Sequence, residues 1–326
     1  MAPLKLATPE QMTPLRRRLE KHLPQAALIH GALLANEAYN GLFDIAATKI
    51  FYSEHTSFVV ATPTITFKGI QSLAFFWEEE EDDREMAAML ATIPSIDWNE
   101  SIFIYASPLA LMKKLEKWIN EGTIGEGFLK SVEITHTYYY SLTSPLPSTE
   151  ISLPDGYEIR ELGREHAQIT LSNWKYNGGE TEEGYERMVT TLPGMGAFVS
   201  TNQKLGKDSI GQMNTDAMKS DGSEEATSDR PMGDALVAWT QLCPFNYFMN
   251  TFTLPTHRGL GLAKAVTVAL AKRALRDTGL ASTYIVVDNH ASIAMHEKLG
   301  FTRHHEVSFQ YYKSTLHPSE PFIENL

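Results

Sequence analysis

The chain is poor in cysteine, in long apolar runs and in positive charge. Cys243 is the only cysteine among 326 residues, which excludes an internal disulfide framework and a cysteine-based zinc cluster and favours a reducing, cytoplasmic environment. No uninterrupted apolar stretch reaches the ~18 residues that a membrane-spanning helix needs, so we expect no membrane partner. The formal net charge of −12 argues against nucleic acid as a partner, because phosphate backbones are bound by clustered lysine and arginine.

The first residues do not resemble a secretory signal. Residues 1–24 contain a basic patch at 16–18, but they also contain Glu10 and Glu20 and lack an apolar signal core. Mitochondrial presequences usually avoid acidic residues. We leave a mitochondrial location open beside the cytoplasmic one.

A proline-rich segment divides the chain. Residues 143–156 include Pro145, Pro147 and Pro154, which lack the N–H group of a strand ladder and favour an extended conformation in the preceding residue. A length of 326 residues with 43% hydrophobic content is enough for two cores. We therefore predict one domain over residues 1–145 and a second over residues 155–326.

The N-terminal half alternates strand and helix patterns. Short apolar strands are predicted at 27–34, 57–61 and 101–105, and helices at 84–91 and 108–120. The acidic run 78–83 is interpreted as a solvated helix entrance, not as a metal site, because adjacent like charges repel one another. This half is expected to be an α/β domain.

The C-terminal half has a similar but longer pattern. Strands are predicted at 157–162, 196–200, 235–241, 247–254, 282–287 and 306–312, and helices at 164–175, 180–191, 259–278 and 291–299. A mixed, mostly antiparallel sheet flanked by helices follows. Residues 201–234 are rich in Ser, Gly, Asp and Lys, and we expect them to form a mobile, tolerated surface insertion.

A glycine turn between a strand and a helix carries the main chemical signal. Gly259 and Gly261 open an amphipathic helix, where unpaired backbone N–H groups and the positive end of the helix dipole favour an anion. Glycine lets a phosphate approach the main chain, and His257, Arg258 and Lys264 add local positive charge. The spacing differs from the dinucleotide fingerprint and from the Gly-Lys-Ser/Thr nucleotide loop. NAD and ATP are therefore disfavoured.

Two segments of the C-terminal half resemble a known superfamily. The turn Arg258-Gly259-Leu260-Gly261-Leu262-Ala263, together with the run from Asn289 to His296-Glu297-Lys298-Leu299-Gly300-Phe301, resembles the signature segments of GNAT acyltransferases. The segments 173–180 and 253–258 look like those of the glycine N-acyltransferase family, which includes the glycine N-acyltransferase-like proteins. The resemblance implies two tandem GNAT-like domains, of which the N-terminal one is degenerate, and one active cleft.

The resemblance also implies the ligands. It predicts an acyl-CoA such as acetyl-CoA as cosubstrate, no metal, and glycine or another small amine or amino acid as the acceptor. Backbone donors on the strand would stabilise negative charge on the thioester carbonyl. The implied cofactor-binding residues are Phe252, Thr253, Leu254, Arg258, Gly259, Leu260, Gly261, Leu262, Ala263 and Asn289. Asn289 is equally interpretable as a helix cap.

The resemblance also implies candidate catalytic residues. Tyr247 occupies the position of the family's glutamate base, but a phenol with a reference pKa of ~10 is a poor base near neutral pH. His296 matches a tyrosine that protonates the CoA thiolate in many GNAT enzymes, and an imidazole could do so, although it could also only pack there. Trp174, Asn177 and Glu180 are expected near the acceptor pocket. Trp174 is also interpretable as core packing, and Glu180 as a first-turn carboxylate that favours a helix N-terminus. Cys243 is interpreted as structural.

Two alternatives to small-amine acylation stay open. A protein N-acetyltransferase would suit an acidic surface that meets a basic peptide. A non-catalytic CoA-binding or scaffold protein would explain why a tyrosine stands where the family has its glutamate.

Overall fold

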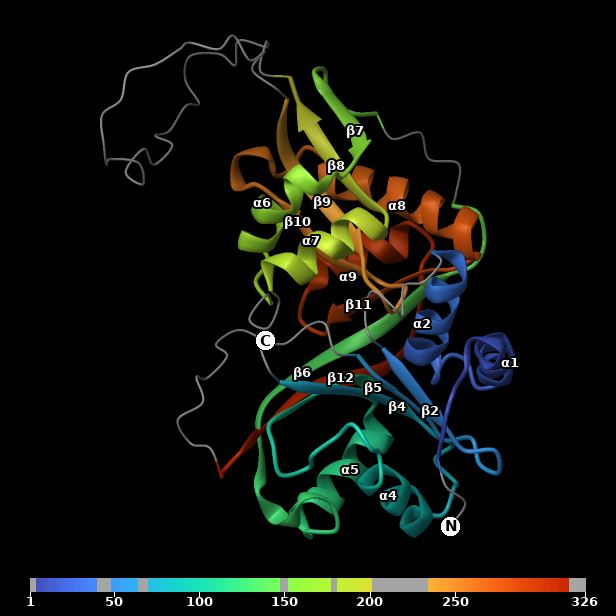
Figure 1. Cartoon of the computed structure of the whole chain (residues 1–326). Coiled ribbons are helices and arrows are strands. Elements are labelled where there is room, and N and C mark those ends of the chain that lie inside the picture. The colour runs from blue at the N-terminus through green and yellow to red at the C-terminus, as the bar shows by residue number, and fades with distance from the viewer. Residues whose placement is uncertain are drawn as a thin grey trace.

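The structure is a computed structural model that describes residues 4–39, 48–63, 70–146, 152–176, 181–200 and 234–316. Its strands form one twelve-stranded sheet in the order β1-β2-β3-β4-β5-β12-β6-β11-β10-β9-β8-β7. The predicted insertion at 201–234 lies outside the described residues except for Asp234. Figure 1 shows the two halves of the molecule meeting at the long strands β6 and β12.

In the described residues, the N-terminal half supplies one end of the sheet and the helices that flank it. Helices α4 and α5 lie together beneath the sheet in Figure 1. The strands are β1 (Lys5–Leu6), β2 (Lys49–Tyr52), β3 (Val59–Thr62), β4 (Gln71–Phe76) and β5 (Ile102–Pro108), and the helices are α1 (Pro9–Glu20), α2 (Ala27–Ala38), α4 (Asp83–Ala91) and α5 (Leu109–Asn120).

The strand predicted at 27–34 is wrong, because these residues begin helix α2. Their side chains are buried along the whole run from Ala27 to Leu33, so the apolar residues show no helical face. A short apolar run of this kind cannot be distinguished from a buried strand by periodicity. The high helix propensity of alanine and leucine accounts for the observed helix.

The C-terminal half contains every strand and helix that the sequence predicts there. The strands are β7 (Tyr157–Glu161), β8 (Gly194–Val199), β9 (Ala235–Leu242), β10 (Phe248–Thr253), β11 (Ala281–Val286) and β12 (Thr302–Ser314), and the helices are α6 (Ala167–Ser172), α7 (Glu182–Thr191), α8 (Leu262–Thr278) and α9 (His290–Lys298). Helix α8 contacts β8, β9 and β10, and its buried face includes Val266 and Leu270. The predicted apolar side of this helix is therefore confirmed.

The two halves exchange their last strands. Strand β6 (Leu129–Leu142) follows β5 in the chain but pairs with β11 and β12, whereas β12 follows β11 but pairs with β5 and β6. Each half is thus completed by a strand that the other half supplies. The α/β class with a mixed sheet is confirmed, and the boundary between residues 145 and 155 stays a prediction.

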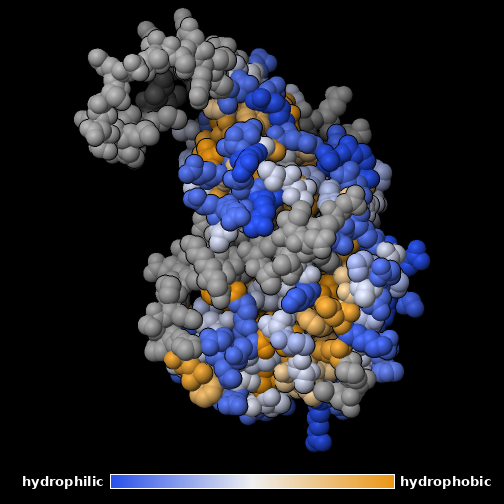
Figure 2. All heavy atoms as spheres, viewed as in Figure 1, coloured by the Kyte–Doolittle hydropathy of each residue, from blue (hydrophilic) through white to orange (hydrophobic). Residues whose placement is uncertain are grey.

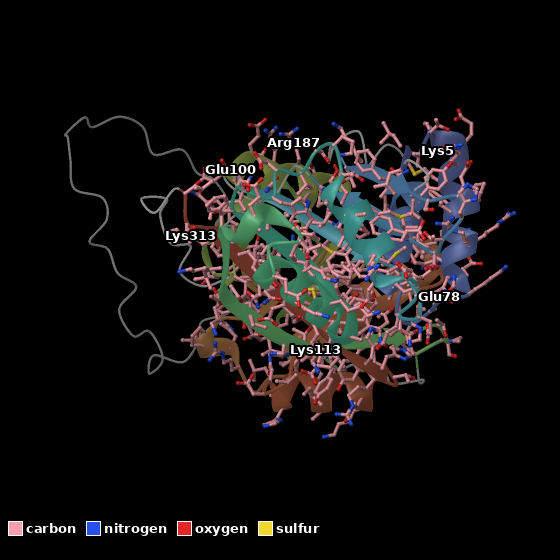
Figure 3. All side chains as sticks on the ribbon, turned by 90° about the horizontal axis from the view of Figure 1, so that it is seen from below. Lys5, Glu78, Glu100, Lys113, Arg187 and Lys313 are labelled. Carbon is pink, nitrogen blue, oxygen red and sulfur yellow. The ribbon has the colours of Figure 1, made fainter. Side chains whose placement is uncertain are left out.

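The surface is mainly polar. Figure 2 shows hydrophilic side chains over most of the visible described face, with apolar patches between them. The labelled residues Lys5, Glu78 and Glu100 extend outward at the rim in Figure 3. Within the described ranges, no helix is both long and apolar enough to cross a membrane.

Candidate active site

Strands β10 and β11 run parallel but separate after their first contact. Their one paired position is Phe248 opposite Thr283, and β10 has an irregularity between Met249 and Phe252. Asn250 lies within this irregularity, with a φ of 51°. Its side-chain amide donates hydrogen bonds to the Thr170 carbonyl (2.8 Å) and the Tyr185 hydroxyl (2.7 Å). These buried contacts attach the bend in β10 to helices α6 and α7.

The separation leaves a main-chain donor of β10 directed at the open side. Leu254 N–H donates to the Val237 carbonyl of β9 (2.9 Å), and the β9 register pairs Thr253 with Ala238. Because successive N–H groups of a regular strand point to opposite sides, that of Thr253 points away from β9. The N–H of Leu254, which is among the predicted cofactor-binding residues, is therefore already used within the sheet.

The glycine turn is open to an approaching ligand. Gly259 and Gly261 have φ values of 80° and 76°, a region that favours glycine because it lacks a Cβ. An added Cβ at either position would meet no heavy atom within 4 Å apart from the adjacent residues. Gly261 is the N-cap of α8, and no side chain caps the helix there. The first N–H groups of α8 therefore remain available to a bound anion.

The side chains around the glycine turn differ in their burial and in the groups they contact. Leu262 is buried (1% exposed) and anchors α8 in the core, whereas Leu260 is 40% exposed. Arg258 Nε donates to the Thr253 carbonyl (3.2 Å), and its guanidinium lies 5.8 Å from the Phe252 ring centroid. The side chain of Arg258 thus lies back along the end of β10.

His257 contributes less charge than the sequence indicated. Its Nδ1 lies 2.8 Å from the Tyr157 hydroxyl, and burial lowers the pKa of its imidazole below the ordinary value. A neutral imidazole is thereby favoured near pH 7. The nearby positive charge comes from Arg258 and Lys264.

The corresponding helix of the N-terminal half has a different N-terminus. Helix α4 connects the parallel strands β4 and β5 as α8 connects β10 and β11. The Asp82 carboxylate accepts hydrogen bonds from the N–H groups of Arg84 (3.0 Å) and Glu85 (2.9 Å). Glu78, in the same acidic run, lies at the rim of the molecule (Figure 3). A phosphate would here meet an occupied helix end and negative charge, which fits the predicted helix entrance.

A cavity of about 330 Å³ lies where β10 and β11 separate. Its wall includes Met249 and Phe252 of β10, Ile285 of β11 and Ser292 of α9. It continues to β5, β6 and β12 of the sheet. Both halves of the chain therefore build this cavity.

His296 is the buried ionisable group of the α9 wall. It is 2% exposed, and its Nδ1 lies 2.8 Å from the Ser292 carbonyl, which can only accept. This contact places the ring proton on Nδ1. Nε2 is buried without a hydrogen-bond partner among the described residues, and burial lowers the pKa of the imidazole. A neutral ring with an available Nε2 lone pair is favoured near neutral pH.

Tyr247 and Asn289 also line the cavity. The Tyr247 ring packs edge-on against the Tyr284 ring with centroids 4.9 Å apart, and burial raises the pKa of its phenol well above the ordinary value. The phenol therefore remains protonated near neutral pH. Asn289 Oδ1 accepts a hydrogen bond from Ser292 N–H (3.2 Å), which realises the helix-cap interpretation and leaves cofactor contact as a prediction.

Comparison with known proteins identifies the fold. Residues 230–310 match the family described as FR47-like protein. Mycothiol acetyltransferase from Paenarthrobacter aurescens (strain TC1) is 49% identical over 51 residues, which cover 15% of this chain and 16% of that protein. A Drosophila protein solved by a structural genomics consortium is similar with a TM-score of 0.73 at 13% identity, covering 94% of this chain and 97% of that one. A tandem GNAT protein from the clavulanic acid biosynthesis pathway gives a TM-score of 0.52 at 15% identity, covering 94% and 98%. The fold is that of the GNAT superfamily.

The GNAT fold explains where the predicted acceptor residues lie. Trp174, in the segment after α6, lines the cavity and packs against the Tyr185 ring with centroids 6.1 Å apart. Its packing is therefore observed, and its role at the acceptor pocket stays a prediction. Asn177 and Glu180 lie outside the described residues.

Sequence reasoning missed the part of the GNAT cavity that β5 and β6 provide. Phe103, Tyr105 and Glu133 line it, and none was a candidate. Residues 129–142 are rich in β-branched and aromatic side chains, a composition that could have indicated a strand. In the part of the chain that the structure describes, no three His, Cys, Asp or Glu side chains gather to hold a metal ion.

Proposed function

We propose that the protein is an acyl-CoA-dependent N-acyltransferase that acylates glycine or another small amine, as its resemblance to glycine N-acyltransferases implies. The observation that carries this proposal is the open, uncapped start of α8 at the end of the separated strand β10. A Cβ at Gly259 or Gly261 would project into open space, so the glycines leave the main chain of the turn accessible to a phosphate. The main-chain N–H groups of residues 261–264 would bind the diphosphate of CoA.

The separated strands would hold the reacting end of the cosubstrate. CoA supplies an acyl group activated as a thioester. The N–H group of Thr253 faces the open side of β10, and it would stabilise negative charge on the acyl carbonyl oxygen. Arg258 and Lys264 give this end of an acidic chain the local positive charge that a polyphosphate requires.

His296 would move the proton of the reaction. Its Nε2, which has no hydrogen-bond partner within the described part of the chain, would take a proton from the acceptor amine as the new C–N bond forms. It would pass this proton to the sulfur as the C–S bond breaks. The imidazole begins and ends neutral, which agrees with the lowered pKa of the buried ring. Protonation of the thiolate, the role predicted from the sequence, becomes the second half of this transfer.

A thiol-release assay tests the proposal. Acetyl-CoA, benzoyl-CoA and a longer acyl-CoA would be offered with glycine, other small amines and a basic peptide, and the products identified by mass spectrometry. We expect thiol release with a small amine and a matching amide product. Acylation of the peptide alone would favour a protein N-acetyltransferase, and saturable CoA binding without release above background would favour a non-catalytic protein.

A further inference from the structure

A row of three side chains crosses the cavity face of β6, β12 and β5. The strand registers place Glu133 directly opposite Tyr311, and Tyr311 directly opposite Phe103. Residues paired in this way have side chains on the same face with Cβ atoms ~4.5–5.5 Å apart. All three residues line the cavity. We call this row the β6 subsite.

The β6 subsite has the chemistry of a cation site. Glu133 is the only Asp or Glu among the described residues that line the cavity. A carboxylate accepts charge-assisted hydrogen bonds from an ammonium group, and the faces of aromatic rings attract a cation. Tyr311 and Phe103 are 2% and 6% exposed, so a cation beside them would be partly removed from water. Removal from water strengthens its attraction to the carboxylate.

Aromatic rings connect the β6 subsite to the place where β10 and β11 separate. The Phe103 ring lies 6.3 Å from that of Phe309, which lies 5.8 Å from that of Tyr284. Tyr284 in turn contacts Tyr247, and all of these residues line the cavity. An aromatic cavity wall of this kind suits a ligand whose uncharged part is apolar or aromatic.

We propose that the β6 subsite binds an ammonium group of the acceptor amine through Glu133, with Tyr311 and Phe103 beside it. This inference rests on the proposed acyl transfer and assigns the acceptor to positively charged amines with an apolar or aromatic body. Thr137 pairs with Val286 of β11, and Glu133 lies four residues further along β6, about 13 Å away in an extended strand. The bound ammonium is therefore either the amine before it reacts or a second charge on the acceptor.

Calorimetric titration of the full-length protein with two amines distinguishes these sources. Phenethylamine carries one ammonium and an aromatic body, and diaminopentane carries two ammonium groups. Glu133→Gln should weaken the Kd about tenfold or more, the effect of losing one charge-assisted hydrogen bond. Glu133→Asp should change the Kd less. The control Glu121→Gln makes the same change of charge at the exposed C-cap of α5, and it should leave the Kd unchanged. If Glu133→Gln weakens the binding of phenethylamine, Glu133 binds the ammonium of the amine that reacts. If the variant weakens the binding of diaminopentane alone, Glu133 binds a second ammonium group of the acceptor.

Unchanged Kd values for both amines in a Glu133→Gln variant that unfolds at the wild-type temperature would overturn the proposal. CoA titration of the same proteins separates the two proposals. If CoA does not bind but the amine Kd still depends on Glu133, the transfer function fails and the subsite stands.

Discussion

Replacing Gly261 by aspartate should convert the start of α8 into an electrostatic copy of the start of α4. Asp82 places a carboxylate at the N-terminus of α4, whereas Gly261 leaves the N-terminus of α8 without one. The added side chain has room, since a Cβ at Gly261 would meet nothing within 4 Å beyond the adjacent residues. Aspartate and asparagine both tolerate the positive φ of this position better than other side chains do. Gly261→Asn is therefore the matched control without charge.

The magnitude follows from the charge alone. Two unit charges about 4 Å apart repel by about 1 kcal/mol in water and by about 4 kcal/mol at an effective dielectric constant of about 20. A carboxylate beside a bound diphosphate should therefore weaken CoA binding between about fivefold and about a thousandfold relative to the asparagine variant. The difference should shrink as salt screens the exposed turn.

Titration calorimetry of CoA against the wild-type protein, Gly261→Asn and Gly261→Asp measures this difference. Both variants should unfold at similar temperatures, because each places a side chain of similar size at the same φ. Equal CoA affinity for the aspartate and asparagine variants at low salt would refute our placement of the diphosphate.

Three further predictions follow from the described contacts. His296→Phe should reduce turnover about a hundredfold or more, with CoA affinity changed far less, because it removes the proton-accepting Nε2. In the wild-type protein, turnover should fall as the pH drops through the lowered pKa of this buried imidazole. A rise in turnover over that pH range would contradict a neutral imidazole in the resting enzyme. Residues 155–326 expressed alone should aggregate, because β11 and β12 lose β6 between them, and coexpressed residues 1–146 should restore a stable complex by gel filtration. Burial lowers the pKa of His305 to about 4, so the unfolded chain protonates this imidazole at a higher pH than the folded protein does. The free energy of unfolding should therefore decrease as the pH falls from about 6.5 to about 4. In urea unfolding, the His305→Phe variant should show a smaller decrease over the same pH range.

The signals that worked in the sequence were local. Gly259 and Gly261 mark a turn because their spacing between an apolar strand and an amphipathic helix requires no distant contact to be recognised. The acidic run before α4 was interpreted as a helix entrance for the same reason, and Asp82 caps that helix. The whole C-terminal order of strands and helices follows from such periodic patterns.

The features that sequence reasoning missed depend on long-range pairing. Nothing in residues 129–142 indicates that they pair with residues 281–286 of the other half, so the exchange of β6 and β12 was not foreseeable. Glu133 reaches the cavity only through this exchange. The direction of the Thr253 N–H depends on the β9 register. The protonation of His296 depends on burial and on the Ser292 carbonyl, and the motif specifies neither.

Hydrogen exchange with and without CoA tests the central claim most directly, because it reports on the main-chain N–H groups themselves. We predict that CoA slows amide exchange in residues 251–264, where β10 is separated from β11 and α8 begins, and leaves residues 78–85 at the start of α4 unchanged. Unaltered exchange at 251–264 in saturating CoA, or protection at 78–85 in its place, would contradict the account.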